Sequence, residues 1–318
     1  MPFQLEDRIA APLAWGCVAI TLATIFVILR FVSRGYILRV LGPTDWAIAT
    51  SLIISLLFTV VTVFEINAGY GYHVWEVEPA QLEAFYKMLY FAVILYSLAI
   101  VATKVSILLL YLDVFSATAV RKATYAVLAA VAIWGTWTVF SSIFRCWPIY
   151  AFWHHEATEN MCFPRIKWTV DNGIHITLDF IIFVLPLPVI RSMTLPVRQK
   201  LWLYFVFALG FLVCLVTAIR IYYSSRIVFS DSTWQATIAV ILSFIELSLS
   251  IAIPCIITLK PLVDRVFPRL LARKGPRSHR FNFDGSPRDD ESIYPPTISS
   301  PTQRLARRDL EMQEVRGK

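Results

Sequence analysis

The chain has 318 residues, of which 57% are hydrophobic and 16% are charged, and its mean hydropathy is +0.63. Because roughly a quarter of the residues in soluble globular domains are charged, this composition excludes an ordinary soluble protein and predicts an all-α, polytopic membrane protein. The net charge of +7 could suggest a nucleic-acid partner, but the basic residues stand at the ends of apolar segments and in the last part of the chain. This placement indicates membrane orientation, so we expect the lipid bilayer as a partner and no nucleic acid.

Residues 1–10 predict a short extracellular N-terminus. They contain Glu6, Asp7 and Arg8, whereas a cleaved signal peptide begins with a basic segment. We therefore expect the apolar segment that follows to stay in the mature protein as a membrane span.

Seven apolar segments, each close to the roughly 20 residues that cross the hydrocarbon core, predict a seven-transmembrane helix bundle over residues 11–259. They cover residues 11–32, 46–64, 88–112, 123–144, 168–189, 201–223 and 234–259. Gly42 and Pro43 break the chain after the first segment, and Asp45 can cap the helix of the second.

The Lys and Arg residues between the spans assign the two sides of the membrane, because cytoplasmic loops are rich in them. One side receives Arg30, Arg34, Arg39, Arg121, Lys122, Arg191, Arg198, Lys200 and seven basic residues from Lys260 to Arg280. The other side receives Arg8, Lys87, Arg145, Arg165, Lys167 and Arg226. The first side is predicted to be cytoplasmic, with the N-terminus outside and the C-terminus inside, as an odd number of spans requires.

The composition changes after the last apolar segment. Residues 260–274 mix apolar and basic side chains, a pattern typical of a juxtamembrane piece lying on the anionic inner leaflet. Residues 275–318 are rich in Ser, Pro, Arg and Asp, and they have too little apolar surface to order themselves. We expect this last part to be a disordered cytoplasmic tail.

A few polar residues inside the apolar segments need a reason. An ionised side chain at the bilayer centre costs at least about 2.5 to 3.5 kcal/mol, so such residues usually face the bundle interior and find partners. The candidates for a ligand pocket or a buried polar network are Lys104, Asp171, His175, Asp179, Arg220 and Glu246. Counted from the outer ends of the spans, Asp179 and Glu246 lie near the midplane and Lys104 lies somewhat deeper. Lys104 is expected to neutralise one of these two acids.

Asp171, His175 and Asp179 follow one another at intervals of four residues, so they project from one face of a helix. This face can belong to a structural network, to a ligand or proton pathway, or to a metal site. Metal is the least supported alternative, because zinc sites use more His or Cys than the chain offers at this depth. We therefore expect no metal.

Cys146 and Cys162 lie in the polar loop between the fourth and fifth segments, whereas the other cysteines lie inside apolar segments. Both face the predicted outer, oxidising side, which favours a disulfide over two free thiols. The disulfide would hold Trp147 and Trp153 over the mouth of the bundle. A second aromatic stretch, residues 69–75, is either an interfacial belt or a lid over a ligand.

These spaced residues resemble the fungal rhodopsin-domain family, the receptor-like membrane proteins that include the PTH-type and satratoxin-cluster proteins. The resemblance covers residues 5–262. It rests on Asp45-Trp46, the Gly69–Trp75 loop, Lys104 to Leu108, Cys146-Trp147-Pro148, Trp153, Cys162, Asp179, Pro186, Pro188, Gln199-Lys200, Gly210, Arg220, Asp231, Glu246 and Pro254. It implies a seven-span, receptor-like protein.

The chain departs from the family in three ways. Leu242 stands where a Trp is frequent, Asp113 stands where an Arg is common, and the cysteine-rich extracellular domain of some PTH-type members is missing. Residues 234–259 contain no Lys, so a retinal Schiff base has no attachment point. We therefore expect no cofactor and no light-driven pumping.

Two functions follow as hypotheses. The first is a receptor-like protein that senses a small ligand at an outward-facing pocket and signals to a cytoplasmic protein, most naturally from the plasma membrane and otherwise from an endomembrane. The second is a membrane-embedded, cyclase-like enzyme or an accessory protein of a fungal secondary-metabolite gene cluster, with Asp179 or Glu246 as a proton donor. The enzyme is the less favoured of the two, and the missing internal repeat argues against a transporter.

Overall fold

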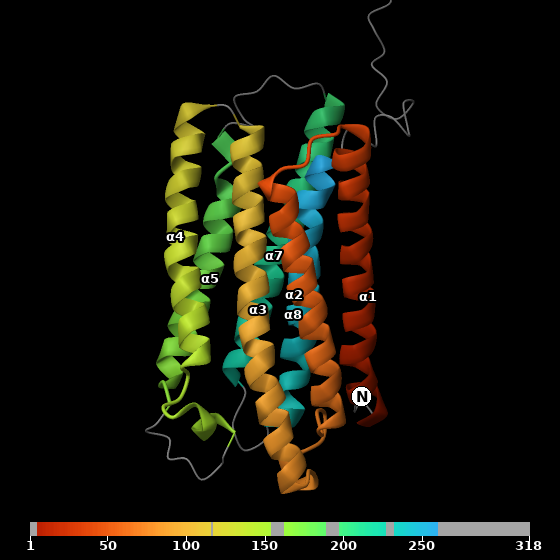
Figure 1. The fold of residues 1–318 in the computed structure, drawn as a ribbon, viewed down its shortest axis with the longest axis vertical. Helices are drawn as coiled ribbons and strands as arrows, with labels where there is room; N and C mark the ends of the chain where they lie inside the picture. Colours follow the sequence, from red (N-terminus) through yellow and green to blue (C-terminus); the bar gives the residue numbers. More distant parts are fainter. Residues whose placement is uncertain (1–4, 116, 154–161, 189–196, 227–231, 260–318) are drawn as a thin grey trace, which may run out of the picture. The chain divides into compact units, whose positions relative to one another are not determined.

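The computed structural model describes residues 5–115, 117–153, 162–188, 197–226 and 232–259, and their regular structure is helical apart from one isolated bridge pair. The helices stand side by side and run alternately in opposite directions (Figure 1). They are α1 (Leu5–Phe31), α2 (Pro43–Asn67), α3 (Pro79–Val114), α4 (Thr118–Ile143), α5 (Arg165–Val184), α7 (Val197–Arg226) and α8 (Ser232–Thr258). A π-helix, η1 (Val32–Ile37), continues α1, and the short 3-10 helices η2 (Val74–Glu76) and η3 (Ile149–Phe152) lie between longer helices.

Six of the described helices are long and apolar enough to cross a membrane. This confirms the predicted all-α, polytopic membrane protein. The helix outside this group is α5, which has 20 residues and carries Lys167, Asp171 and Asp179. Its outward face is nevertheless apolar, with Ile166, Val170, Ile174, Phe180 and Ile181 exposed. A seventh span through α5 therefore stays a prediction.

Two helices begin earlier than the apolar segments predicted. The first starts at Leu5, and α3 starts at Pro79, nine residues before the predicted span. Proline suits the first turn of a helix, where its missing N–H would have no partner. An ion pair of 2.7 Å between Glu83 and Lys87, one turn apart, supports the polar start of α3.

The core of the bundle forms around α3, which packs against α2, α4 and α8. Its buried members include Phe58, Ala99, Leu108 and Phe244. Small residues allow close approach between helices in a membrane, and Gly135 on α4 is an example. A Cβ atom added there would lie 2.8 Å from Val101 Cγ1 on α3.

Large apolar side chains cover the outward faces of the helices. Examples are Trp15, Ile25, Ile53, Phe64, Ile133, Phe140 and Phe211. In water such a surface would drive association, so it fits the lipid bilayer that the composition predicts.

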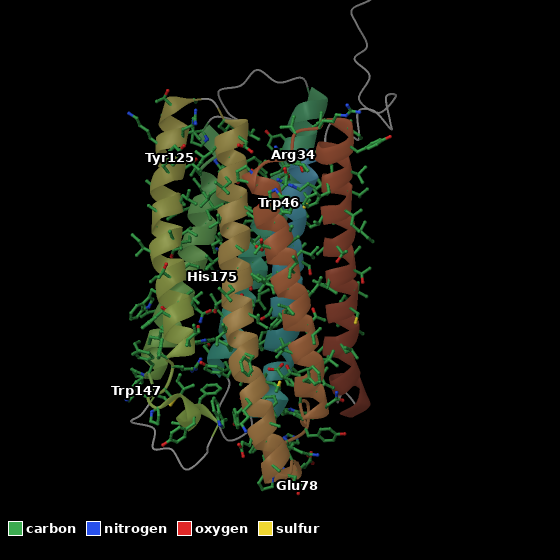
Figure 2. All side chains as sticks on the ribbon, in the orientation of Figure 1. Arg34, Trp46, Glu78, Tyr125, Trp147 and His175 are labelled. Atoms are coloured by element: carbon green, nitrogen blue, oxygen red, sulfur yellow. A yellow bond between two sulfur atoms is a disulfide. The ribbon has the colours of Figure 1, made fainter. Side chains whose placement is uncertain are left out.

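Figure 2 shows Arg34 and Tyr125 near one end of the bundle, Glu78 and Trp147 near the other, and His175 between them. The helix α1 begins at the end that holds Trp147, and α8 finishes at the opposite end (Figure 1). This arrangement fits an odd number of passes. Which end faces the cytoplasm stays a prediction from the basic residues, and the predicted segments 260–274 and 275–318 lie outside the described residues.

Candidate functional site

The loop after α4 is fastened to the end of the bundle. Cys146 and Cys162 lie at disulfide distance, in agreement with the predicted pair. The ring of Tyr90 on α3 lies 5.7 Å from that of Phe152 and 5.9 Å from that of Trp153. Trp147, which the sequence also placed over the bundle mouth, is 75% exposed. The loop therefore packs on α3 through Phe152 and Trp153.

Lys104 on α3 forms an ion pair with Asp179 on α5. The lysine is 3% exposed, and its Nζ lies 5.9 Å from the centre of the Trp134 ring on α4. Of the two acids that the sequence offered as its partner, the structure therefore selects Asp179.

Glu246 on α8 has its own set of partners. Its Oε2 lies 2.8 Å from Arg220 Nε and accepts a 2.7 Å hydrogen bond from the Tyr96 hydroxyl, while its Oε1 accepts a 2.7 Å bond from Thr217. Arg220 also donates from Nη2 to the Asn172 side chain, at 3.0 Å. The buried Glu246 carboxyl group is therefore surrounded by one guanidinium and two hydroxyl donors.

His175 lies between these two ion pairs. Its Nε2 is 3.4 Å from Asp179 Oδ2 and 3.7 Å from Glu246 Oε1. Neither His175 Nε2 nor Asp179 Oδ2 has a hydrogen-bond partner among the described residues. The Trp134 ring is stacked on the imidazole with 5.5 Å between ring centres, which fixes the plane of the histidine.

We call Lys104, His175, Asp179, Arg220 and Glu246 the ionic cluster. It joins α3, α5, α7 and α8, and it contains two fixed cations and two carboxylates. One nitrogen or oxygen atom from each of His175, Asp179 and Glu246 lies within 4.8 Å of the other two, a spacing that one hydroxyl group can bridge.

These three side chains also form a nitrogen and oxygen set of the kind that can bind a metal ion. The charges around them oppose this use. Lys104 and Arg220 already balance both carboxylates, so a divalent ion would leave two uncompensated positive charges in a medium of low dielectric constant. The charges of Lys104 and Arg220 thus disfavour a divalent metal at these three side chains.

Asp171 does not join the ionic cluster. It pairs with Lys167 at 2.7 Å and accepts a 3.3 Å hydrogen bond from Trp137 Nε1. Burial lowers the pKa of the nearby Arg145 guanidinium, and the Asp171 carboxylate opposes that shift. The three polar residues predicted on one face of α5 are therefore divided, with Asp171 near the loop and the other two in the cluster.

The sequence did not predict the neutral partners of the cluster. These are Tyr96, Trp134, Asn172 and Thr217. Thr217 stands three residues before Arg220, on the same helix face, and this spacing could have identified it. Nothing in the sequence separates Tyr96 from the other tyrosines of α3.

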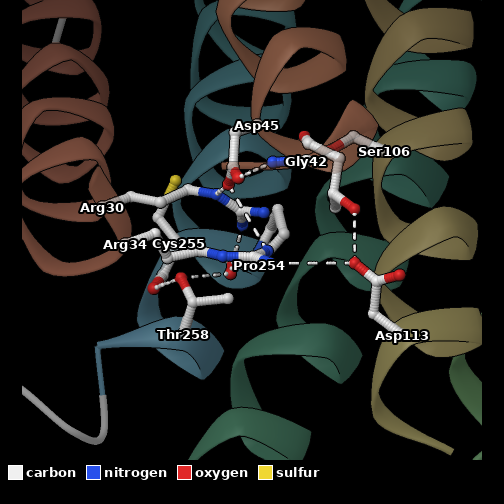
Figure 3. A network of polar contacts seen from close by, with 10 residues as sticks. Arg30, Arg34, Gly42, Asp45, Ser106, Asp113, Pro254, Cys255 and Thr258 are labelled. Carbon is white, nitrogen blue, oxygen red and sulfur yellow. Dashed lines mark hydrogen bonds and ion pairs between the residues drawn. The ribbon is translucent and has the colours of Figure 1, made fainter. Parts of the chain in front are cut away.

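A second buried ion pair lies near the end of the bundle that holds Arg34. Arg30 Nε lies 2.8 Å from Asp45 Oδ1, and both side chains are fully buried (Figure 3). From the sequence, Arg30 is expected to be one of the basic residues of the cytoplasmic side, and Asp45 is expected to cap the helix of the second span. Asp45 does accept a 2.9 Å bond from Gly42 N, so the capping prediction is confirmed, but the buried partnership was not foreseen.

Comparison with known proteins identifies relatives. A protein described as "SAT4 family membrane protein" from Emericella nidulans is 30% identical over 174 residues, which is 53% of this chain and 45% of the relative. "Polyenoic acids biosynthesis gene cluster protein Ba17b" of Metarhizium anisopliae is 23% identical, covering 77% of this chain and 71% of the relative. "Receptor GIN3" of Arthrobotrys oligospora is 24% identical, covering 70% and 54%. The chain thus spans about half the length of two of these relatives.

No solved structure matches the chain. The model of the fungal rhodopsin domain, in contrast, matches residues 29–265, which is most of the chain and includes the ionic cluster. This match confirms the resemblance that the sequence motifs carried. The chain is therefore a member of the fungal rhodopsin domain family.

Proposed function

We propose that the protein is a receptor-like membrane protein whose ionic cluster responds to a small ligand. The observation that carries the proposal is the pair of facing polar atoms, His175 Nε2 and Asp179 Oδ2, which have no hydrogen-bond partner among the described residues. Leaving buried polar atoms unpaired costs about 1 to 3 kcal/mol each. A ligand hydroxyl that accepts from the imidazole and donates to the carboxylate would recover that energy.

The ligand would approach from the loop side. Along α5, the Asp171 and Lys167 pair lies between the loop and the ionic cluster, so polar groups continue inward from that end. The Tyr90 and Trp153 contact holds the loop beside this route. The ligand class that fits is a small, mostly apolar molecule with one hydroxyl group, because the surroundings of the cluster are aromatic and its charges are already balanced.

Signalling would use the opposite end of the bundle. We assign that end to the cytoplasm from its excess of Lys and Arg, with α5 as the seventh span. The Arthrobotrys relative described as a receptor supports this reading. We expect the protein in the plasma membrane, where an outward pocket meets extracellular ligands.

An accessory role in a biosynthetic gene cluster is the second candidate, because the Metarhizium relative carries that description. A catalytic role is the weaker form of this candidate. A general acid must hold a proton that it can give up, but Asp179 and Glu246 are each paired with a fixed cation.

The two functions are separated by complementing a deletion strain of the host fungus with the wild-type or a His175→Phe protein. A receptor predicts that the His175→Phe strain loses its transcriptional response to culture extracts while metabolite yields stay unchanged when transcription is held constant. The accessory role predicts lower yields even at constant transcription. A strain with no change in either quantity would contradict both functions.

A further inference from the structure

Pro254 lies inside α8, one turn before the end of the helix. Proline has no N–H to donate, and its ring displaces the carbonyl of the preceding turn, so the helix is weakened at this point. In membrane helices, neighbouring groups usually satisfy the freed backbone. The turn from Cys255 to Thr258 therefore depends on contacts outside the helix for its position.

Arg30 on α1 supplies a polar contact to this turn. Its Nη1 donates a 2.8 Å hydrogen bond to the carbonyl oxygen of Pro254, which also receives a longer bond of 3.3 Å from Thr258 Oγ1. Asp45 on α2 fixes the other side of the same guanidinium (Figure 3). Arg30 thus adds a polar tie between the last turn of α8, α1 and α2 to the apolar cluster in which Cys255 is buried with Val27 and Ile48.

Some buried polar atoms near this contact lack a hydrogen bond. Arg30 Nη2 and the hydroxyl of Ser33 are both buried without a hydrogen-bond partner among the described residues. A buried charged group with an unmade bond carries a desolvation cost, which exposure to water would remove. The neighbouring segment η1 is a π-helix, a form that recurs at functional sites in helices.

The same helix carries the ionic cluster. Glu246 stands eight residues before Pro254, which places the two about 12 Å apart along α8. A change in the partners of Glu246 that moves α8 would reach the Pro254 contact directly. The two sites are therefore connected by one continuous helix.

We propose that Arg30 is a releasable clamp on the last turn of α8, and that the partners of Glu246 decide whether it is closed. The closed clamp is the resting state, and its release lets water reach the end of the bundle that Arg34 marks. The trigger rests on the proposed function, since a ligand at the ionic cluster would supply it. Release itself is a property of the protein without ligand.

Cys255 offers a built-in reporter. Its side chain is fully buried beside Pro254, and the chain's other free cysteines are Cys17 and Cys214. In a Cys17→Ala, Cys214→Ala background in lipid nanodiscs, the rate of modification by N-ethylmaleimide is followed by mass spectrometry. Because Arg30 and Asp45 also act on the Cys255 thiol itself, each rate is divided by the thiolate fraction of that variant, and the quotient measures how often water and reagent reach this turn.

Asp45→Asn removes the counter-charge of the clamp and should raise the rate of Cys255 modification about tenfold, because hydrogen bonds to charged groups are the strong ones. Asp113→Asn is the matched control. It removes the same charge from the half-exposed edge of the network, where Arg34 Nη2 lies 3.8 Å from Asp113 Oδ2, and should change the rate less than about twofold.

Arg30→Lys gives an independent version of the test. It keeps the charge but replaces the two separate nitrogens that bond the Asp45 carboxylate and the Pro254 carbonyl by a single one, so a faster rate is again expected. Monodispersity and helical circular dichroism identify folded protein. An unchanged rate in either folded variant overturns the clamp. Failure to find a ligand for the ionic cluster would leave this result untouched, because no ligand is added.

Discussion

His175 Nε2 and Asp179 Oδ2 face each other at 3.4 Å inside the bundle, and neither atom has a hydrogen-bond partner among the described residues. At the same time, the second oxygen of Asp179 is bound by Lys104. The cluster is thus balanced in charge and incomplete in hydrogen bonds. Charge balance explains why it is stable in the bundle, and the unmade bonds explain why it can respond to a hydroxyl group.

The Lys104 and Asp179 pair predicts strong coupling between two substitutions. Lys104→Met or Asp179→Leu alone should destabilise the folded protein by about 3 to 5 kcal/mol, because each leaves an unpaired buried charge. The double variant should be clearly less destabilised than the sum of the two. Thermal unfolding of the four proteins in one detergent measures this difference, and additive effects would show that the two side chains do not act as a pair.

The disulfide in the loop after α4 predicts that reduction lowers the thermal stability of the protein. A bridge across 16 positions between Cys146 and Cys162 should contribute about 3 kcal/mol through the restricted unfolded state. The double variant Cys146→Ser, Cys162→Ser should therefore unfold at a lower temperature than the wild type, and reductant should lower only the wild-type transition. Equal transitions with and without reductant would mean that the thiols are not bonded.

Two glycines make a matched pair for testing helix packing. Gly135→Ala should destabilise the protein by about 1 to 3 kcal/mol, since its new methyl group would press on Val101. Gly173→Ala adds the same group where nothing lies within 4 Å, so it should be neutral or stabilising by up to about 1 kcal/mol. Adding Val101→Ala to Gly135→Ala should restore stability. Equal effects of the two glycine variants would contradict the close contact of α3 and α4.

The fold was largely predictable because a membrane leaves few choices. Apolar segments of sufficient length must become helices that satisfy their own backbone, and each predicted segment overlaps a described helix over most of its length. The limits of α1 and α3 were not predictable from apolar character, since both helices continue into polar sequence. Composition did not establish α5 as a span, because the polar face that builds the cluster makes it less apolar than the other helices.

The sequence predicted which charged residues belong to the site, but it did not predict which of them form ion pairs with one another. The cost of a charge in lipid pointed to Lys104 and Glu246, but depth alone could not choose between two acids as the lysine's partner. The Arg30 and Asp45 pair was missed for a different reason. Each residue had a sufficient local explanation, and only the packing of α1, α2 and α8 brings them together.

The proposed control of the far end of α8 by the ionic cluster is tested most directly by one measurement. Glu246→Gln keeps the shape of the side chain but removes the charge that holds Arg220. In the Cys17→Ala, Cys214→Ala background, N-ethylmaleimide should modify Cys255 at least about threefold faster in this variant than in its parent. This is the scale expected for coupled sites. An unchanged rate in folded Glu246→Gln protein would contradict communication between the cluster and the clamp.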